Sequence, residues 1–229
     1  MPEATLALYG HSFSSYTWKA LIGLFANDTP FVFHQIGPDA PEEDNAFIHA
    51  AHPAGKFPVL ADGDTIIIEA TAIIEHLAVH HPGPAPLIPT EPAEAAVARM
   101  LDRVFDNYLQ HNFQRIVGAY LTNTEVGNMP VIGEPDMKEV DAGKAGLRRA
   151  YAWLERWLET HALPPHVSLV SCAAAPALFY ADWCDPLPAE TPRLRALRTE
   201  LLALPAVSRC AEEARPYRRY FPPGYPERD

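Results

Sequence analysis

Three hydroxyl groups and a phenol stand together in the segment FSSYTWKALIGLF, where Ser14, Ser15 and Thr17 flank Tyr16. The apolar spacing after them predicts an amphipathic helix that ends near Asn27, so Ser14 or Ser15 can be its N-cap. Capping explains such a serine without any ligand. A serine hydroxyl at the same position can also donate a hydrogen bond to a thiolate and lower the pKa of that thiol, with help from the helix dipole.

A proline next to a predicted strand is the second candidate, in the segment KFPVL. A trans proline that simply starts a strand is the ordinary explanation for Pro58. The alternative is a cis bond between Phe57 and Pro58, a rarer arrangement that usually has a local reason. A cis turn would expose the N–H and C=O groups of Val59 for antiparallel pairing with a peptide-like ligand.

The third candidate is the start of a later helix, at Glu69, Ala70 and Thr71. An acidic residue stabilises a helix N-terminus, which accounts for Glu69 without a ligand. The free N–H groups of a helix N-terminus also bind carboxylates, and Glu69 suits an ammonium group. Together these groups would recognise the head group of an α-amino acid.

The elements that must position these residues alternate at the start of the chain. The turn signal Asp62-Gly63-Asp64 separates two apolar runs and predicts a hairpin. The order β-α-β-α-β-β-α implies a parallel first pair of strands and an antiparallel hairpin at the edge. The predicted strands are 6–9, 31–35, 59–61 and 65–68, and the predicted helices are 14–27, 42–49 and 70–80.

The composition changes after His81. Five prolines in residues 82–93 exclude a helix and a central strand, which indicates an extended linker. Helices are predicted beyond it, at 94–120, 138–161, 169–183, 192–203 and 206–214, followed by an irregular tail. The helix capped by Ser168 is apolar all round, so it should be buried, and Pro176 should kink it. A small α/β unit beside an all-helical unit leaves a cleft for a ligand.

Composition excludes several classes of function. The net charge of −11 argues against nucleic acid as a partner. The sequence has no run of 18 apolar residues and no secretory signal, so we expect no membrane span and a cytoplasmic location. Cys172, Cys184 and Cys210 should be buried thiols. The histidines form no metal-ligand pattern, and His80 and His81 suit a helix C-terminus, so no metal is expected.

As a set, these features resemble the cytosolic glutathione S-transferase superfamily. The element order, the FPVL turn, the Glu-x-x-Ala-Ile helix start and the proline linker extend the resemblance over essentially the whole chain. The opening LYGHSFSSYTWKALIGL is similar to that of the bacterial, serine-type theta and zeta enzymes. The resemblance implies a thioredoxin-like glutathione-binding domain at 1–81, a linker at 82–93, an all-α domain at 94–229 and a homodimer.

The resemblance also implies roles for the first two candidate segments. Ser14 should contact the sulfur of glutathione, and Ser15 is the alternative. The bond between Phe57 and Pro58 should be cis, and Val59 should pair through its backbone with the cysteinyl unit.

At the other end of glutathione, the resemblance places Glu69 near the γ-glutamyl group and Lys56 near the glycine carboxylate, although Lys56 can equally be a solvated charge. The superfamily usually has Ser or Thr where this chain has Ala70. Losing a hydrogen bond to a charged group costs roughly 1.5–3 kcal/mol, so we expect weak glutathione binding. Backbone N–H groups at Ala70 and Thr71 remain, and the Thr71 hydroxyl could compensate.

The activity implied by the resemblance is activation of the glutathione thiol for attack on a small hydrophobic electrophile. A glutathione-dependent isomerase or lyase and a non-catalytic binding or scaffold protein are the alternatives. Zeta enzymes carry a cysteine where this chain has Tyr16, which argues against the zeta isomerases. The residues expected to line the wall for the second substrate are Phe13, Phe105, Tyr108, Asn112 and Phe113.

Overall fold

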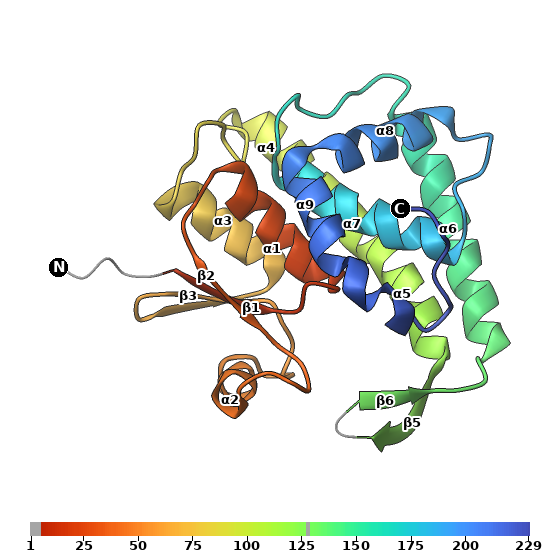
Figure 1. Cartoon of the computed structure of the whole chain (residues 1–229). Helices are drawn as coiled ribbons and strands as arrows, with labels where there is room; N and C mark the ends of the chain where they lie inside the picture. The colour runs from red at the N-terminus through yellow and green to blue at the C-terminus, as the bar shows by residue number, and fades with distance from the viewer. Residues whose placement is uncertain (1–5, 127–128) are drawn as a thin grey trace.

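An α/β unit lies on one side of the molecule and a set of helices on the other (Figure 1). The computed structural model describes residues 6–126 and 129–229, with the backbone alone for residues 123–126 and 129–130. A thioredoxin-like first unit followed by a mostly helical remainder confirms the predicted fold class. The two units meet along α1 (Ser15–Ala26), which packs against helices of both.

The sheet of the first unit has the order β2-β1-β3-β4. As predicted, β1 and β2 are parallel, and β3 and β4 form an antiparallel hairpin that closes at the Asp62–Thr65 pair. Gly63 takes a φ of 56° in this turn, a conformation that glycine adopts without steric cost. The strands are β1 (Ala7–Gly10), β2 (Val32–Gln35), β3 (Val59–Asp62) and β4 (Thr65–Ile68).

Two further helices complete the first unit, α2 (Glu42–Ala51) and α3 (Ala70–His80). α1 and α3 lie side by side against the sheet (Figure 1). Leu8 and Leu60 from the sheet and Leu21 and Ile73 from the helices are almost fully buried and join one core with the helical unit. This packing fixes the N-terminal ends of both helices relative to the strands.

The helical unit surrounds α7 (Leu169–Cys184), whose residues are all buried, as its apolar sequence predicts. The predicted helix over 94–120 is divided by a π-helical segment, Phe105–Gln110. Such segments are rare and frequent at functional sites. The remaining helices are α4 (Pro92–Val104), α5 (His111–Ala119), α6 (Met137–Trp157), α8 (Pro192–Ala203) and α9 (Pro205–Ala214).

A two-stranded hairpin extends from the helical unit, formed by β5 (Leu121–Val126) and β6 (Met129–Ile132) (Figure 1). Glycine and proline predicted only a break in this segment. Helix α5 ends earlier, at Ala119, and the chain then forms two antiparallel strands, with Leu121 opposite Ile132. The tail is likewise not wholly irregular, because Arg215–Tyr220 forms a 3₁₀ helix.

Candidate functional site

A cavity of about 320 Å³ opens at the N-terminus of α1, between the two units. Both predicted serines lie on its wall, and so does the residue before Pro58. The remaining lining comes from the loop between β1 and α1, from α5 and α7 and from the C-terminal tail, and sequence analysis predicted only Phe13 and Phe113 among these residues. The cavity is lined by His11, Phe13, Ser14, Ser15, Phe57, Phe113, Gln114, Val117, Tyr180, Tyr220, Phe221 and Pro222.

Ser14 is the N-cap of α1. Its backbone is extended, and its hydroxyl oxygen accepts a hydrogen bond from the Thr17 N–H at 3.3 Å. A serine hydroxyl has one proton to donate in addition to the lone pairs that accept. The cap therefore uses an acceptor site of Ser14 and leaves the proton available to a group in the cavity.

Ser15 is the first residue of α1 and is 5% exposed, whereas Ser14 is half-buried. Both contribute to the same wall, so the structure brings the two predicted residues together. The first turn of α1 contains no acidic side chain. The positive end of the helix dipole is therefore not offset by a local carboxylate and favours an anion at this position.

The peptide bond between Phe57 and Pro58 is cis, as the resemblance implies. Val59, however, is fully buried in the interior of the sheet, paired with Tyr9 of β1 on one side and Ile68 of β4 on the other. Its backbone therefore faces neighbouring strands, and its predicted pairing with a ligand is wrong. Phe57 lies beside the cavity instead.

The N-terminus of α3 carries the third predicted group. Glu69 is the exposed N-cap and has a φ of 70°, the left-handed region that favours glycine. Its Oε1 lies 3.6 Å from Nε2 of His52. Ala70 is buried, with 5% of its surface exposed, and Lys56 is exposed. Glu69 is therefore held next to free helix N–H groups, while its carboxylate stays in solvent.

The Thr71 hydroxyl is already engaged inside the protein. It donates to Oδ2 of Asp102 at 3.0 Å and accepts from Nζ of Lys19 at 2.9 Å. Arg103 also donates to it. These bonds leave no donor on Thr71 that could replace the hydroxyl missing at Ala70.

The comparisons with known proteins agree with this geometry. Residues 8–85 match the family model for the glutathione S-transferase N-terminal domain. These residues form a glutathione S-transferase N-terminal domain.

Three relatives illustrate the similarity. A probable maleylacetoacetate isomerase from Vibrio cholerae serotype O1 is 28% identical over 222 residues, which cover 93% of this chain and 98% of the relative. Glutathione transferase F7 from Populus trichocarpa has a TM-score of 0.76 at 23% identity, with 92% of this chain and 99% of that chain covered. A glutathione S-transferase from Methylobacterium radiotolerans, solved with glutathione sulfonate, has a TM-score of 0.71 at 20% identity, with 90% and 94% covered.

Aromatic rings form the wall of the cavity that faces the helical unit. The Tyr180 hydroxyl donates to the backbone oxygen of Phe13 at 2.8 Å, which ties α7 to the loop before α1. The ring of Phe113 stacks on Tyr180 with centroids 5.7 Å apart, and Phe13 and Phe221 meet edge to face at 6.2 Å. Sequence analysis missed Tyr180 and Phe221, because aromatic residues in a buried helix or tail look like core.

Of the other residues predicted for this wall, the structure brings none to the cavity. Phe105 is 1% exposed and belongs to the core. Tyr108 and Asn112 line a separate hollow with Trp153, between the π-helical segment, α5 and α6. Their predicted role at the second-substrate wall is wrong, because helical periodicity does not show which face of the long helix points to α1.

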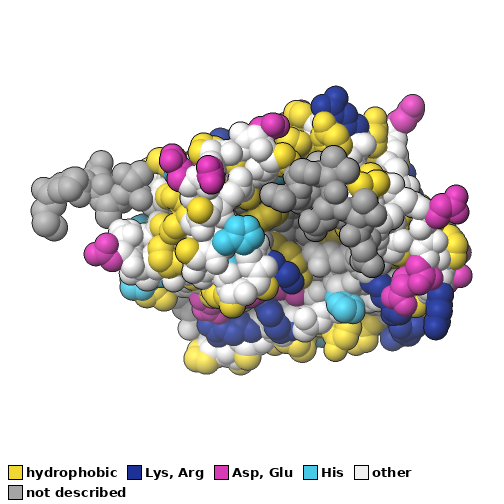
Figure 2. Space-filling model, turned by 90° about the horizontal axis from the view of Figure 1, so that it is seen from below, with side chains coloured by type: hydrophobic (Ala, Val, Ile, Leu, Met, Phe, Trp, Pro, Cys, Tyr) yellow, Lys and Arg dark blue, Asp and Glu magenta, His cyan; other side chains and the backbone are white. Residues whose placement is uncertain are grey.

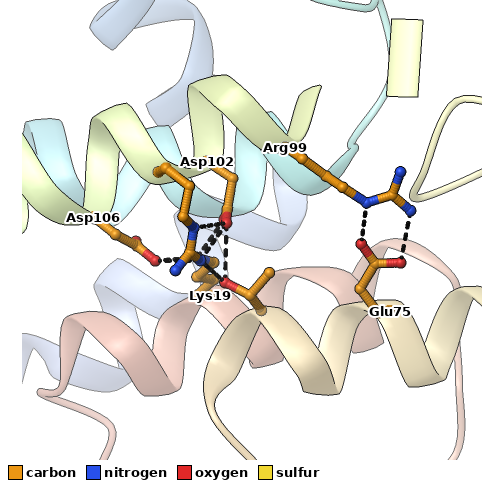
Figure 3. Close-up of polar contacts among 7 residues, drawn as sticks. Lys19, Glu75, Arg99, Asp102 and Asp106 are labelled. Carbon is orange, nitrogen blue, oxygen red and sulfur yellow. Dashed lines mark hydrogen bonds and ion pairs between the residues drawn. The ribbon is translucent and has the colours of Figure 1, made fainter. Parts of the chain in front are cut away.

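A buried charged cluster lies just below the candidate site and was missed by sequence analysis. Lys19 has no exposed surface, and its Nζ contacts Oδ1 of Asp102 and lies 2.7 Å from Oδ2 of Asp106 (Figure 3). Arg103 contacts both aspartates from the solvent side. Through Thr71 the cluster also reaches α3, so it joins α1, α3, α4 and the π-helical segment. It therefore links the two units close to the N-termini of α1 and α3.

Tyr16 is not placed to act as an ionised group. Burial, with smaller contributions from Asp106 and Glu69, raises the pKa of its phenol to about 12. The phenol therefore stays protonated at neutral pH.

The protein's own thiols are free and buried, as predicted. Burial raises the pKa of Cys172 and of Cys184 to about 12, and it also raises that of Cys210. The thiolate is the reactive form of cysteine. A reactive sulfur at this site therefore has to come from a bound molecule.

The surface adds two general observations. On the face shown in Figure 2, acidic and basic side chains are intermixed, with hydrophobic side chains between them. Among the helices that the structure describes, none combines the length and the apolar character needed to cross a membrane.

Proposed function

We propose that the chain is a glutathione transferase that binds glutathione between the N-termini of α1 and α3 and stabilises its thiolate with Ser14. The observation that carries this proposal is the half-buried Ser14 hydroxyl on the cavity wall, at the positive end of α1. A donated hydrogen bond favours the ionised thiol. The thiolate sulfur then forms a bond to an electrophilic carbon. In a substitution the leaving group departs with its bonding electron pair, and in an addition the π electron pair moves to the neighbouring atom, which takes a proton from solvent.

Ser14 is favoured over Ser15 for this role. Ser15 is almost completely buried within the first turn of the helix, while Ser14 precedes the helix and is more exposed. Its capping bond also fixes the oxygen in place, so that little reorganisation is needed when the thiolate forms.

The tripeptide is held by three further parts of the site. Phe57 offers backbone groups beside the cavity for the cysteinyl unit, in the role first predicted for Val59. The N–H groups of Ala70 and Thr71 bind the γ-glutamyl carboxylate at the start of α3, and Glu69 faces the ammonium group. Lys56 is exposed and can reach the glycine carboxylate. Without a hydroxyl at Ala70, and with the Thr71 hydroxyl engaged elsewhere, binding is weak.

The electrophile is a small hydrophobic molecule that lies against the aromatic wall. Rings from Phe13, Phe113, Tyr180 and Phe221 enclose the helical side of the cavity, next to the predicted position of the sulfur. Holding both reactants there supplies proximity, which is a large part of the rate enhancement available without further chemistry.

A glutathione-dependent isomerase is the second candidate, because the Vibrio cholerae relative is a probable maleylacetoacetate isomerase. In that reaction the thiolate adds to the substrate and is eliminated again, so glutathione is regenerated. Tyr16 stands where zeta enzymes carry a cysteine, which favours conjugation. Following glutathione concentration distinguishes the two, since conjugation consumes one molecule per turnover and isomerisation consumes none.

The proposal includes the predicted organisation of the protein. A thioredoxin-like domain at 1–81, a linker at 82–93 and a helical domain at 94–229 would associate as a cytoplasmic homodimer. The structure starts α4 at Pro92, within the predicted linker. Light scattering on the purified chain measures the oligomeric state, and a monomeric mass would contradict the dimer.

The test of the proposed function is a calorimetric titration with glutathione followed by a panel of electrophiles. We expect saturable binding at glutathione concentrations well above micromolar and conjugation with at least one electrophile. The absence of binding at millimolar glutathione would favour a non-catalytic scaffold, and a micromolar dissociation constant would contradict the weak binding attributed to Ala70.

A further inference from the structure

Two histidines from α3 meet one carboxylate from the β3–β4 hairpin, away from the cavity at α1. Nε2 of His76 lies 2.8 Å from Oδ2 of Asp62, and Nε2 of His81 lies 2.7 Å from the same oxygen. Asp62 is 14 residues from His76 and 19 residues from His81 in the sequence, so no short sequence motif identifies the group. The sequence analysis assigned His81 only to a helix end.

The geometry of the three ligand atoms suits a small divalent ion. All three atoms lie within 4.8 Å of one another. A tetrahedral zinc with bonds of about 2.0–2.1 Å needs ligand atoms about 3.3 Å apart. The two nitrogen–oxygen distances therefore have to grow by about half an ångström, which small rotations of the side chains can provide.

The donor set also fits. Two imidazole nitrogens and one carboxylate oxygen are typical ligands of zinc sites that keep a fourth position for water. Oδ2 of Asp62 accepts a hydrogen bond from each histidine, so the oxygen and the two nitrogens already face one another. Side-chain exposures of 13% for His76, 17% for Asp62 and 28% for His81 leave the group partly buried but reachable from solvent.

We propose that Asp62, His76 and His81 bind a divalent transition-metal ion, with zinc the ion best suited to the donors. The Asp62 carboxylate can only accept hydrogen bonds, so each Nε2 carries a proton in the ion-free state. When the ion binds, Nε2 of each neutral imidazole gives up its proton to solvent and Nδ1 takes one from solvent, so that each ring stays neutral. The ion then joins the end of β3 to the last turn of α3, immediately before the proline-rich segment.

The site is independent of the proposed transferase function, because none of its residues lines the cavity at α1. The same three side chains also bond to one another without an ion. A clamp made only of hydrogen bonds and a metal site therefore differ in one measurable property, which is stoichiometric zinc uptake.

The experiment is a zinc titration of the full chain in competition with a chromophoric chelator. We expect one zinc per chain with an affinity of micromolar or better. Asp62→Asn, His76→Gln and His81→Gln should each weaken binding at least tenfold, with circular dichroism confirming that each variant folds. If wild type binds no more zinc than the variants, the group is a hydrogen-bonded clamp and the proposal is wrong.

A matched control lies on the same helix. His80 is exposed, and its ring centroid is 4.4 Å from that of His76, but it lies outside the three-ligand group. His80→Gln should leave zinc affinity within about twofold of wild type. A loss as large as that of His81→Gln would show that the ligands are not the three named here.

Discussion

The first and second turns of α1 use polar side chains in opposite ways. In the first turn, the Ser14 hydroxyl accepts one capping bond and keeps its proton for the cavity. One turn later, Lys19 is fully buried, and Thr71, Asp102 and Asp106 together match the three N–H donors of its ammonium group. A group poised for chemistry retains unused bonding capacity beside a cavity, whereas a structural group has its capacity satisfied inside the protein.

The largest effect is expected at Lys19, in the second turn of α1. Lys19→Met removes the charge that neutralises Asp102 and Asp106, both nearly buried, and should lower the free energy of unfolding by about 3–5 kcal/mol. Denaturant unfolding measures the loss. The control is Arg99→Ala, which breaks a more exposed ion pair with Glu75 (Figure 3) and should cost no more than about 1 kcal/mol.

Equal losses in the two variants would contradict the distinction between a buried and a surface pair. The buried cluster would then contribute no more to stability than an exposed contact, and its position between the two units would not explain how they are held together.

The next largest effect is expected at Ser14, at the start of α1. Ser14→Ala removes a hydrogen bond to a charged group and should lower kcat/KM for conjugation by about 10- to 150-fold. It also removes a cap, at about 1 kcal/mol of stability. Ser14→Gly separates the loss of the hydrogen bond from the loss of the helix cap, because glycine is a fair N-cap without a hydroxyl. It should lose the same activity with little loss of stability, and Ser15→Ala should retain activity.

A third variant tests the weak end of the glutathione site. Ala70→Ser restores the hydroxyl that the superfamily usually has at the start of α3, and should tighten glutathione binding about tenfold. Calorimetry measures the change. Ala72→Ser on the exposed side of the same helix is the control and should leave the affinity unchanged. An unchanged affinity in Ala70→Ser would remove the explanation for weak binding.

The smallest effect is expected at Tyr16, between the two turns. Because burial raises the pKa of its phenol to about 12, the group stays protonated below about pH 11 and contributes no ionisation to the reaction. Tyr16→Phe should therefore leave the pH profile of kcat/KM unchanged up to about pH 10. The loss of a limb of that profile in the variant would show that the Tyr16 hydroxyl ionises in the reaction, and would contradict its assignment as a protonated group.

Local patterns predicted most of the fold. The Asp62-Gly63-Asp64 turn, the serine cap and the apolar periodicities act over a few residues, so the sequence was enough to place the sheet hairpin and the main helices. Two of the features that escaped prediction depend on distant partners. Lys19 meets carboxylates far along the chain, and Val59 is excluded from ligand binding by strands that the pattern does not position.

The most direct measurement is the pH titration of the thiol in bound glutathione, followed by thiolate absorbance in wild type and in Ser14→Gly. We expect the pKa of the bound thiol to lie below that of free glutathione in wild type and to return towards the free value in the variant. The same pKa in both proteins would show that Ser14 does not stabilise the thiolate, and would contradict the proposed mechanism.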